Sequence, residues 1–409
     1  MRRIIIPAVM IILFSTGCKD GTLLPKGIEI TDLEMVRIIA LDRGKAPDAV
    51  KVSIMARGQE GGNAESGGDG KGEGQRSKLE AIILTAEGKS VLDTVRNFQT
   101  YTDKQMFLGH IDFYLIGEEA ARENLSKYVD FISRDDEVRL NSTIFIVEGP
   151  AGKILEISNA SDYFLPERLK NLSQNISLLS ISSKMKLLDL IGRLDENGTF
   201  GIAVPCIRQT VFEKQQENGE IGLKNEFTLD GYAIIKDLKL VGFIHCPVSR
   251  GYNFICNKVF SGTIDLSDPE GNTVTTEILG SRTSIVPRIK GNRLVGVDIR
   301  TQFETNIDEV HSTEDIFRED TLRFLERQQS DRIKDEMEKC VEAAKEYKTD
   351  FIGIGEKVNL RHPILWKGLK EQWPLIFADL PVTVEVESRI DRSYNIREPN
   401  GYTKEGGKR

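Results

Sequence analysis

Short apolar runs separated by polar turn formers recur along the first 150 residues. Five of them are rich in β-branched or aromatic residues and predict strands; they cover residues 33–41, 50–56, 79–86, 111–116 and 143–147. Between them, apolar residues at helical spacing predict helices over 90–101, 118–122 and 125–132, and Pro150 opens another helix toward 157. This alternation predicts a mixed sheet covered by helices.

The pattern changes after residue 157. Residues 158–200 are rich in Ser, Asn, Leu and Lys and predict two helices, near 166–172 and 184–194. Strands return from 201 to 243, where Lys236-Asp237 separates two apolar runs and predicts a hairpin. Residues 259–308 then read as an antiparallel meander, with turns at 268–272 and 290–292.

A long helix is expected over residues 313–348, opened by a capping box of Ser312 and Asp315. One apolar stripe runs along it and predicts packing on a sheet; the stripe is Ile333, Met337, Cys340, Ala344, Tyr347 and Phe351. A shorter helix over 365–377, a final strand over 382–386 and a frayed tail follow.

These elements predict an α+β fold of three consecutive mixed α/β domains, the last an antiparallel sheet packed against a long helix. The expected segments are a signal peptide at 1–17, an N-terminal α/β domain at 18–157 and a middle domain at 158–257. A C-terminal domain of 258–392 and a frayed tail of 393–409 complete the chain.

The N-terminal segment indicates how the chain reaches a membrane. Two arginines precede eleven apolar residues, which are too few for a bilayer span of about 20, and small residues then lead to Cys18. This order predicts a signal peptide cleaved before Cys18, whose thiol carries a diacylglyceryl anchor. An ordinary signal peptide that ends near a cysteine is the alternative, because Ser15 stands where such a cleavage site usually has Leu.

Composition argues against several classes of function. The formal charge of −8 disfavours binding to nucleic acid or, through basic residues, to anionic lipid. The Gly-rich residues 58–78 are expected to form a disordered loop, and they lack the GK[ST] of a phosphate loop. No CxxC or HExxH is present, so neither a metal nor a cofactor is predicted. Pairing of Cys246 with Cys256 stays open.

Four features invite a catalytic interpretation, and each has a structural alternative that we favour. His110 is expected to be a packed, hydrogen-bonded histidine rather than a base or ligand. The charged residues 134–139 are expected to form a salt-bridged turn, with a partner-docking surface as the alternative. The S-x-x-K of Ser183 and Lys186 lacks its companion motifs and reads as a polar helix. The glycines of 353–355 indicate a tight turn. No catalytic residue is predicted.

Four blocks, in order and at their spacing, resemble the Ger(x)C family, the lipoprotein C subunit of bacterial spore germinant receptors. The first is the signal segment that ends at Cys18. The others are 107–110 (FLGH) with 116–122 (IGEEAAR), 130–139 (DFISRDDEVR), and 350–355 (DFIGIG) with Pro363, Trp366 and Trp373 after it.

The resemblance implies a non-enzymatic subunit, anchored through lipid on Cys18 to the outer face of the spore inner membrane. It would act in spore germination, by assembly or by signal transmission, beside two integral-membrane subunits that sense nutrients. The alternatives from other classes are an extracytoplasmic solute-binding lipoprotein of a transporter and a tethered hydrolase that uses Ser183 or His110.

Overall fold

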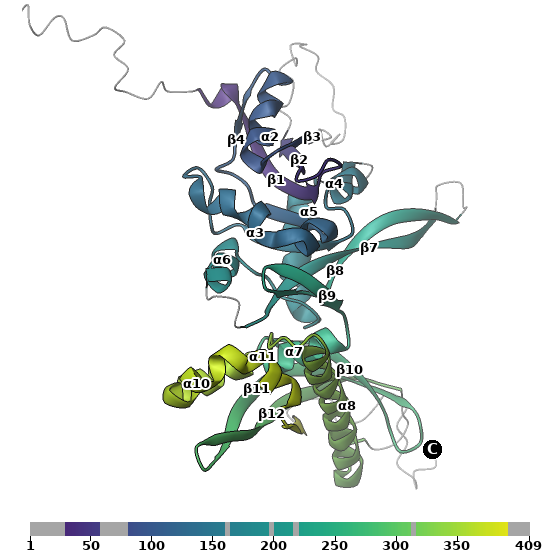
Figure 1. The fold of residues 1–409 in the computed structure, drawn as a ribbon. Coiled ribbons are helices and arrows are strands. Elements are labelled where there is room, and N and C mark those ends of the chain that lie inside the picture. The colour runs from purple at the N-terminus through teal and green to yellow at the C-terminus, as the bar shows by residue number, and fades with distance from the viewer. Residues whose placement is uncertain are drawn as a thin grey trace, which may run out of the picture.

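The computed structural model describes residues 29–57, 81–159, 164–195, 200–215, 221–311 and 316–391. Two β-sheets organise this part of the chain, and Figure 1 shows them one after the other along an elongated molecule. The α+β fold class predicted from the sequence is confirmed. The domain boundaries at 157/158 and 257/258 stay predictions.

Several predicted features lie outside the described residues. They are the signal peptide with Cys18, the Gly-rich segment 58–78, the capping box of Ser312 and Asp315, and the tail 393–409. Among the described residues, no helix combines the length and the apolar character that crossing a membrane requires.

The first sheet has nine strands and mixes parallel with antiparallel pairs. Its main path runs β3-β2-β1-β5-β6-β7-β8-β9, and β4 pairs with β1 beside that path. β1, β5, β6 and β7 are parallel neighbours, whereas the remaining pairs on the path are antiparallel. The strands are β1 (Leu33–Arg43), β2 (Val50–Arg57), β3 (Ala81–Gly88), β4 (Gln105–Phe107), β5 (Phe113–Gly117), β6 (Thr143–Glu148), β7 (Ile202–Gln215), β8 (Ile221–Lys236) and β9 (Lys239–Ile244).

Helices cover both faces of this sheet. Ile39 and Leu41 of β1 face one core, which also contains residues of α2 (Val91–Asn97), α3 (Glu118–Arg134) and α6 (Leu187–Asp195). Ile38 and Ala40 face the other core, formed with α4 (Gly152–Asn159) and α5 (Leu165–Asn175). Burial on both sides explains the nearly continuous apolar runs of the central strands.

Two local predictions in this sheet region are confirmed. α3 was expected as two segments, and Asn124 interrupts it with non-helical angles (φ −173°, ψ 109°). The β8–β9 hairpin pairs Lys236 with Lys239, and its turn residues Asp237 and Leu238 both have positive φ.

The second sheet has the order β10-β11-β12-β13. β10 (Thr263–Ser267), β11 (Thr273–Lys290) and β12 (Arg293–Val310) form the predicted antiparallel meander. β13 (Val382–Ile390) instead pairs with β12 in parallel. The reason is that a long helical crossover joins these two strands, and it returns the chain to the side of the sheet from which β12 started.

One face of this sheet packs against helices. The covering helices are α7 (Val248–Ile255), α8 (Glu319–Glu346), α9 (Ile354–Arg361), α10 (Pro363–Leu369) and α11 (Trp373–Asp379). The predicted stripe of α8 is buried there at Ile333, Met337, Cys340 and Ala344, while Phe351 joins the same core after the helix ends.

The helical predictions need three corrections. The long helix begins at Glu319 in the structure, after the N-cap residue Arg318. The single helix expected over 365–377 is broken into α10 and α11, because Pro374 has no N–H to continue a helical ladder. Neither α7 nor α9 was predicted.

Candidate functional site

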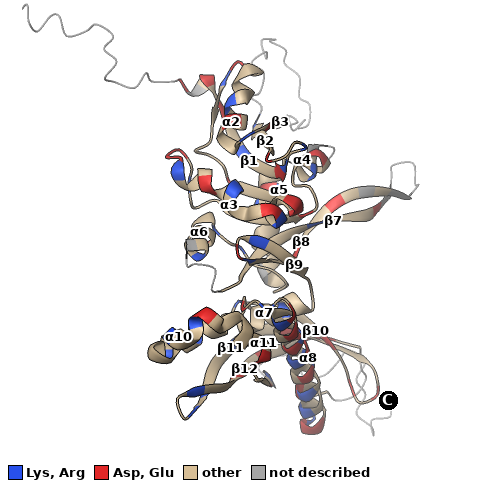
Figure 2. Cartoon of the chain, in the orientation of Figure 1, with Lys and Arg blue, Asp and Glu red and all other residues tan. Residues whose placement is uncertain are grey.

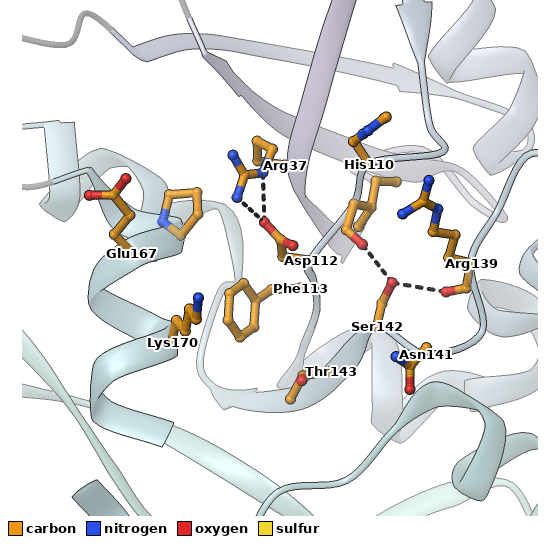
Figure 3. Close-up of a pocket in the computed structure, with 12 residues that line it drawn as sticks. Arg37, His110, Asp112, Phe113, Arg139, Asn141, Ser142, Thr143, Glu167 and Lys170 are labelled. Carbon is orange, nitrogen blue, oxygen red and sulfur yellow. Dashed lines mark hydrogen bonds and ion pairs between the residues drawn. The ribbon is translucent and has the colours of Figure 1, made fainter. Parts of the chain in front are cut away.

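The parallel strands β1, β5 and β6 bring their N-terminal parts to one edge of the nine-stranded sheet. A pocket of about 570 Å³ lies there (Figure 3). Residues from the strand starts, from the loops before β5 and β6, and from α5 line it. They are Arg37, His110, Ile111, Asp112, Phe113, Arg139, Asn141, Ser142, Thr143, Pro166, Glu167 and Lys170.

An ion pair forms the centre of the pocket wall. Nε of Arg37 donates to Oδ2 of Asp112 over 2.6 Å. A backbone hydrogen bond joins the same two residues, since the Asp112 amide donates to the Arg37 carbonyl over 2.9 Å. Both side chains are partly exposed, 28% for Arg37 and 42% for Asp112, so the ion pair itself contributes at most about 1 kcal/mol. Its role is to hold the starts of β1 and β5 together.

The Ser142 hydroxyl in the pocket is hydrogen-bonded to backbone carbonyls. Oγ of Ser142 lies 2.5 Å from the Ile111 carbonyl oxygen and 2.8 Å from that of Arg139. The hydroxyl has a single proton, which these two carbonyl oxygens share, and neither of them is a general base. Ser142 therefore ties two loops together and is not arranged as a nucleophile.

His110 is exposed, which contradicts the expectation of a packed, hydrogen-bonded histidine. It stands in the turn between β4 and β5, and its ring lies beside that of Phe107, with the centroids 5.3 Å apart. Side chains in such a turn point into solvent, whereas the neighbouring strand β5 is buried at every residue. Within the described part of the chain, no group of His, Cys, Asp and Glu side chains could hold a metal ion.

A turn follows α3 within residues 134–139 as expected, but the ion pair lies inside the helix, because Arg134 is the last residue of α3 and pairs with Asp130. The prediction of a salt-bridged turn is therefore confirmed only as a turn. Nε of Arg134 donates to Oδ2 of Asp130 over 2.7 Å, and this bond lowers the pKa of the exposed Asp130 carboxyl. Oδ1 of Asp135 accepts from the Glu137 amide over 3.0 Å, which closes the turn locally. Arg139 contributes to the pocket wall instead.

Two further sequence features have structural explanations. Ser183 and Lys186 lie on an extended segment before α6, so the polar helix predicted for them is wrong and the S-x-x-K geometry is absent. Cys206, Cys246, Cys256 and Cys340 are all free, which answers the open question of a Cys246–Cys256 disulfide.

The glycine turn of 353–355 is confirmed, and its purpose is visible. Gly353 has a φ of +79°, and the chain then folds back over Asp350. That carboxylate accepts from the amides of Ile354 and Gly355 over 3.0 and 2.6 Å and from the indole Nε1 of Trp373 over 3.0 Å. A Cβ at Gly355 would lie 2.8 Å from atoms of both Trp366 and Trp373. The motif thus joins α9 to α11.

Comparison with known proteins shows the family of this chain. A family profile described as "Spore germination protein N-terminal domain" matches residues 26–209, and one described as "Spore germination B3/ GerAC like, C-terminal" matches residues 230–394. The chain belongs to the Ger(x)C family. The expectation drawn from its four sequence blocks is therefore confirmed.

Relatives and a solved structure agree with this family. "Spore germination protein B3" of Bacillus subtilis (strain 168) is 26% identical, over 76% of this chain and 81% of its own length. "Spore germination protein KC" of the same strain is 22% identical over 96% of both chains. The crystal structure of the GerBC protein has a TM-score of 0.52 at 17% identity and covers 86% of this chain and 96% of its own, which supports the Ger(x)C fold.

The family blocks in the described residues serve to connect elements. In the IGEEAAR block, Oε2 of Glu118 accepts from the Gly149 amide over 3.1 Å and joins the start of α3 to the end of β6. Asp42 was missed by the sequence analysis although it has a similar task. Its two oxygens accept from the Ala151 and Gly152 amides over 2.7 and 2.8 Å. A carboxylate at the end of an apolar strand was the available signal.

Proposed function

We propose that this chain is a lipid-anchored, non-enzymatic subunit of a spore germinant receptor. Membership of the Ger(x)C family over residues 26–209 and 230–394 supports the proposal most strongly. Relatives that carry the name of spore germination proteins place the role in germination. The pocket at the N-terminal edge of β1, β5 and β6 supports a non-enzymatic role, since the Ser142 hydroxyl and the Asp112 carboxylate are engaged in structural bonds.

The anchor is diacylglyceryl on Cys18, with acylation at the new N-terminus after cleavage. Each buried CH₂ contributes roughly 0.8 kcal/mol, and two or more chains give stable attachment where one does not. Ten residues separate Cys18 from the first described residue, so the folded body would lie close to the outer face of the spore inner membrane. Two integral-membrane receptor subunits are the proposed partners there. Attachment to one membrane raises their local concentration and favours assembly.

The anchor is tested by Cys18→Ala in the native spore. We expect this variant to leave the membrane pellet after a salt wash, because without lipid only contacts with the proposed partner subunits hold it there, and salt weakens the electrostatic part of such contacts. Cys246→Ala is the matched control, because Cys246 is an exposed free thiol distant from the signal segment in sequence. Membrane attachment and normal germination of the Cys18→Ala strain would disprove the anchor.

Assembly is tested separately by purification from detergent-solubilised spore membranes. We expect two integral-membrane proteins to accompany the chain through affinity and size-exclusion steps. The alternative of a transporter's solute-binding lipoprotein makes a different prediction, namely tight binding of an amino acid or sugar by the purified chain alone. The two sheets of this chain differ in size and topology, whereas a solute-binding protein of that class would have two similar lobes around a cleft.

A further inference from the structure

A second hollow lies where α6 of the first sheet region meets the helices and strands of the second. Its volume is about 380 Å³, within the range of small-molecule sites. α6 contributes Arg193, while α7 with the residues after it, β11 and α9 contribute the rest. Binding sites occur preferentially at such junctions between structural units.

Positive charge is concentrated in this hollow. Its basic residues are Arg193, Lys258, Arg282, Lys357 and Arg361, and its acidic residue is Glu356. The whole chain has a net charge of −8, so the local excess runs against the overall balance. Across the part of the chain that the structure describes, none of these five cations has a carboxylate ion-pair partner.

Other cations of the chain do form ion pairs with carboxylates. Arg250 is bound by both oxygens of Glu336, and Arg168 donates to Glu226 over 2.7 Å. Figure 2 likewise shows basic and acidic residues interspersed along α3 and α8. Several like charges gathered around one concave surface raise the local concentration of ions of opposite sign.

Of the five cations of the hollow, Lys258 is the most enclosed, because the other four are exposed. Its Nζ lies 5.0 Å from the centre of the Tyr252 ring and 5.7 Å from that of Tyr232, and it donates to the Tyr252 hydroxyl over 3.3 Å. Burial lowers the pKa of the Lys258 ammonium and outweighs the opposite effects of Cys256 and Asp189, and the positive charge of Arg193 lowers this pKa as well. An ammonium has three N–H donors, and contact with aromatic rings replaces only part of the hydration that it loses on burial.

The backbone beside Lys258 is fixed. Asn257 has a φ of +55°, and its side chain forms two bonds with the backbone of Thr283 in β11: Nδ2 donates to the carbonyl over 2.9 Å, and Oδ1 accepts from the amide over 2.7 Å. The loop is therefore docked on the second sheet, and the ammonium is held in one place.

We infer that this hollow binds a compact dianion, of which the phosphate monoester group is the type, between Lys258 and Arg193. The enclosed ammonium takes one oxygen, and the guanidinium on α6 closes over the group from the first sheet region. Phe351, Ile352 and Leu360 line the same hollow and offer an apolar surface to the rest of the ligand. Binding would thus join the two halves of the molecule. This inference is independent of the proposed receptor function.

The test uses the full-length chain in neutral detergent and inorganic phosphate as the probe. Trp366 and Trp373 are the two tryptophans of the sequence, and both lie in the second sheet region, so their fluorescence follows thermal unfolding of that half. We expect phosphate to raise the unfolding midpoint saturably, relative to sodium chloride of equal ionic strength. Lys258→Met and Arg193→Ala should each weaken phosphate binding by about tenfold or more, because each removes a charge-assisted hydrogen bond.

The variants separate binding from folding. Lys258→Met should unfold without phosphate at the same temperature as the wild type or higher, since it replaces an enclosed charge by an apolar chain of similar length. Lys290→Ala, at the exposed last residue of β11, is the charge-matched control and should respond to phosphate like the wild type. An absent response in the wild type, or equal responses in all variants, would overturn the inference.

A parallel arm distinguishes a free phosphate from a lipid headgroup. Short-chain phosphatidic acid, whose headgroup is a phosphate monoester, is added to the micelles in place of phosphate, with short-chain phosphatidylcholine as the reference lipid. Stabilisation by phosphate alone assigns the hollow to a soluble ligand. Stabilisation by phosphatidic acid alone, lost in Lys258→Met, assigns the hollow to a phosphate-monoester lipid headgroup.

Discussion

β5 and β13 show how differently the two sheets are built. Every residue of β5 is buried, whereas only two of the nine residues of β13 are. The first sheet has helices on both faces, and the second has them on one. A central strand of the first sheet, such as β5, is therefore apolar throughout, while a strand in the second alternates, as β11 does.

The interiors differ in chemistry as well. The core around β13 encloses polar groups: Arg250 and Glu336 form a buried ion pair between α7 and α8, and Oε1 of Gln329 is an acceptor for the Thr305 hydroxyl over 3.2 Å. Buried polar groups of the first sheet region bond to the backbone: Asp42 accepts from two amides, and the Ser142 hydroxyl donates to backbone carbonyls. The comparison teaches that the second half contains, besides bonds of this kind, a buried pair of opposite charges.

Glu336→Gln should have the largest effect. Arg250 would then keep a buried charge without its counter-charge, which destabilises proteins by about 3–5 kcal/mol. The measurement is urea unfolding followed by tryptophan fluorescence. Glu338→Gln is the control, because its side chain is exposed and pairs with Lys334 only at 3.8 Å, and it should cost about 0.5 kcal/mol or less.

A double variant sharpens this result. Arg250→Met with Glu336→Leu removes both charges and should restore most of the lost stability. A loss in the double variant as large as in Glu336→Gln would show that packing at these positions, rather than charge pairing, supports the second half.

Leu115→Ala compares the two sheets directly. Leu115 is fully buried in β5, so the substitution should destabilise the chain by about 3 kcal/mol through lost burial and a residual cavity. Leu279→Ala makes the same chemical change in β11, where the side chain is 44% exposed, and should cost under about 1 kcal/mol. Urea unfolding followed by far-ultraviolet circular dichroism measures both losses of stability. Equal losses would contradict the description of the first sheet as covered by helices on both faces and the second on one.

The stability contribution of Asp350 should depend on pH. Burial raises its pKa to about 6 from the ordinary 3.8. Between these two values the folded state binds a proton that the unfolded state has lost, so the contribution of Asp350 to stability falls as pH rises from about 4 to about 6 and is constant above. Because Asp350 accepts from the Trp373 indole, fluorescence of the folded chain should titrate with a midpoint near 6.

Two variants assign this titration. Trp373→Phe should remove it, while Trp366→Phe should retain it, since only Trp373 bonds to the carboxylate. Glu356→Gln should move the midpoint to lower pH, because the charge of Glu356 raises the pKa of Asp350. A midpoint that stays near 4 in the wild type would mean that the three N–H donors outweigh desolvation.

The sequence by itself determined the elements whose pattern is local. The runs at 33–41 and 143–147 became β1 and β6, the break before Leu125 became the interruption of α3, and the spacing from Ile333 to Ala344 placed one face of α8 in a core. The four family blocks could likewise be recognised from their residues and their order along the sequence. Each of these depends on neighbours within one or two turns or on a contiguous run.

Only the tertiary structure decided the features that join distant residues. Arg250 and Glu336 are 86 positions apart, and Lys258 and Arg193 come from different structural units, so no local periodicity relates them. The parallel pairing of β13, the pocket at the N-terminal edge of β1, β5 and β6, and the basic hollow all arise where the chain returns on itself. Their physical cause is long-range packing, in which a residue's partners are chosen by topology and not by its place in the sequence.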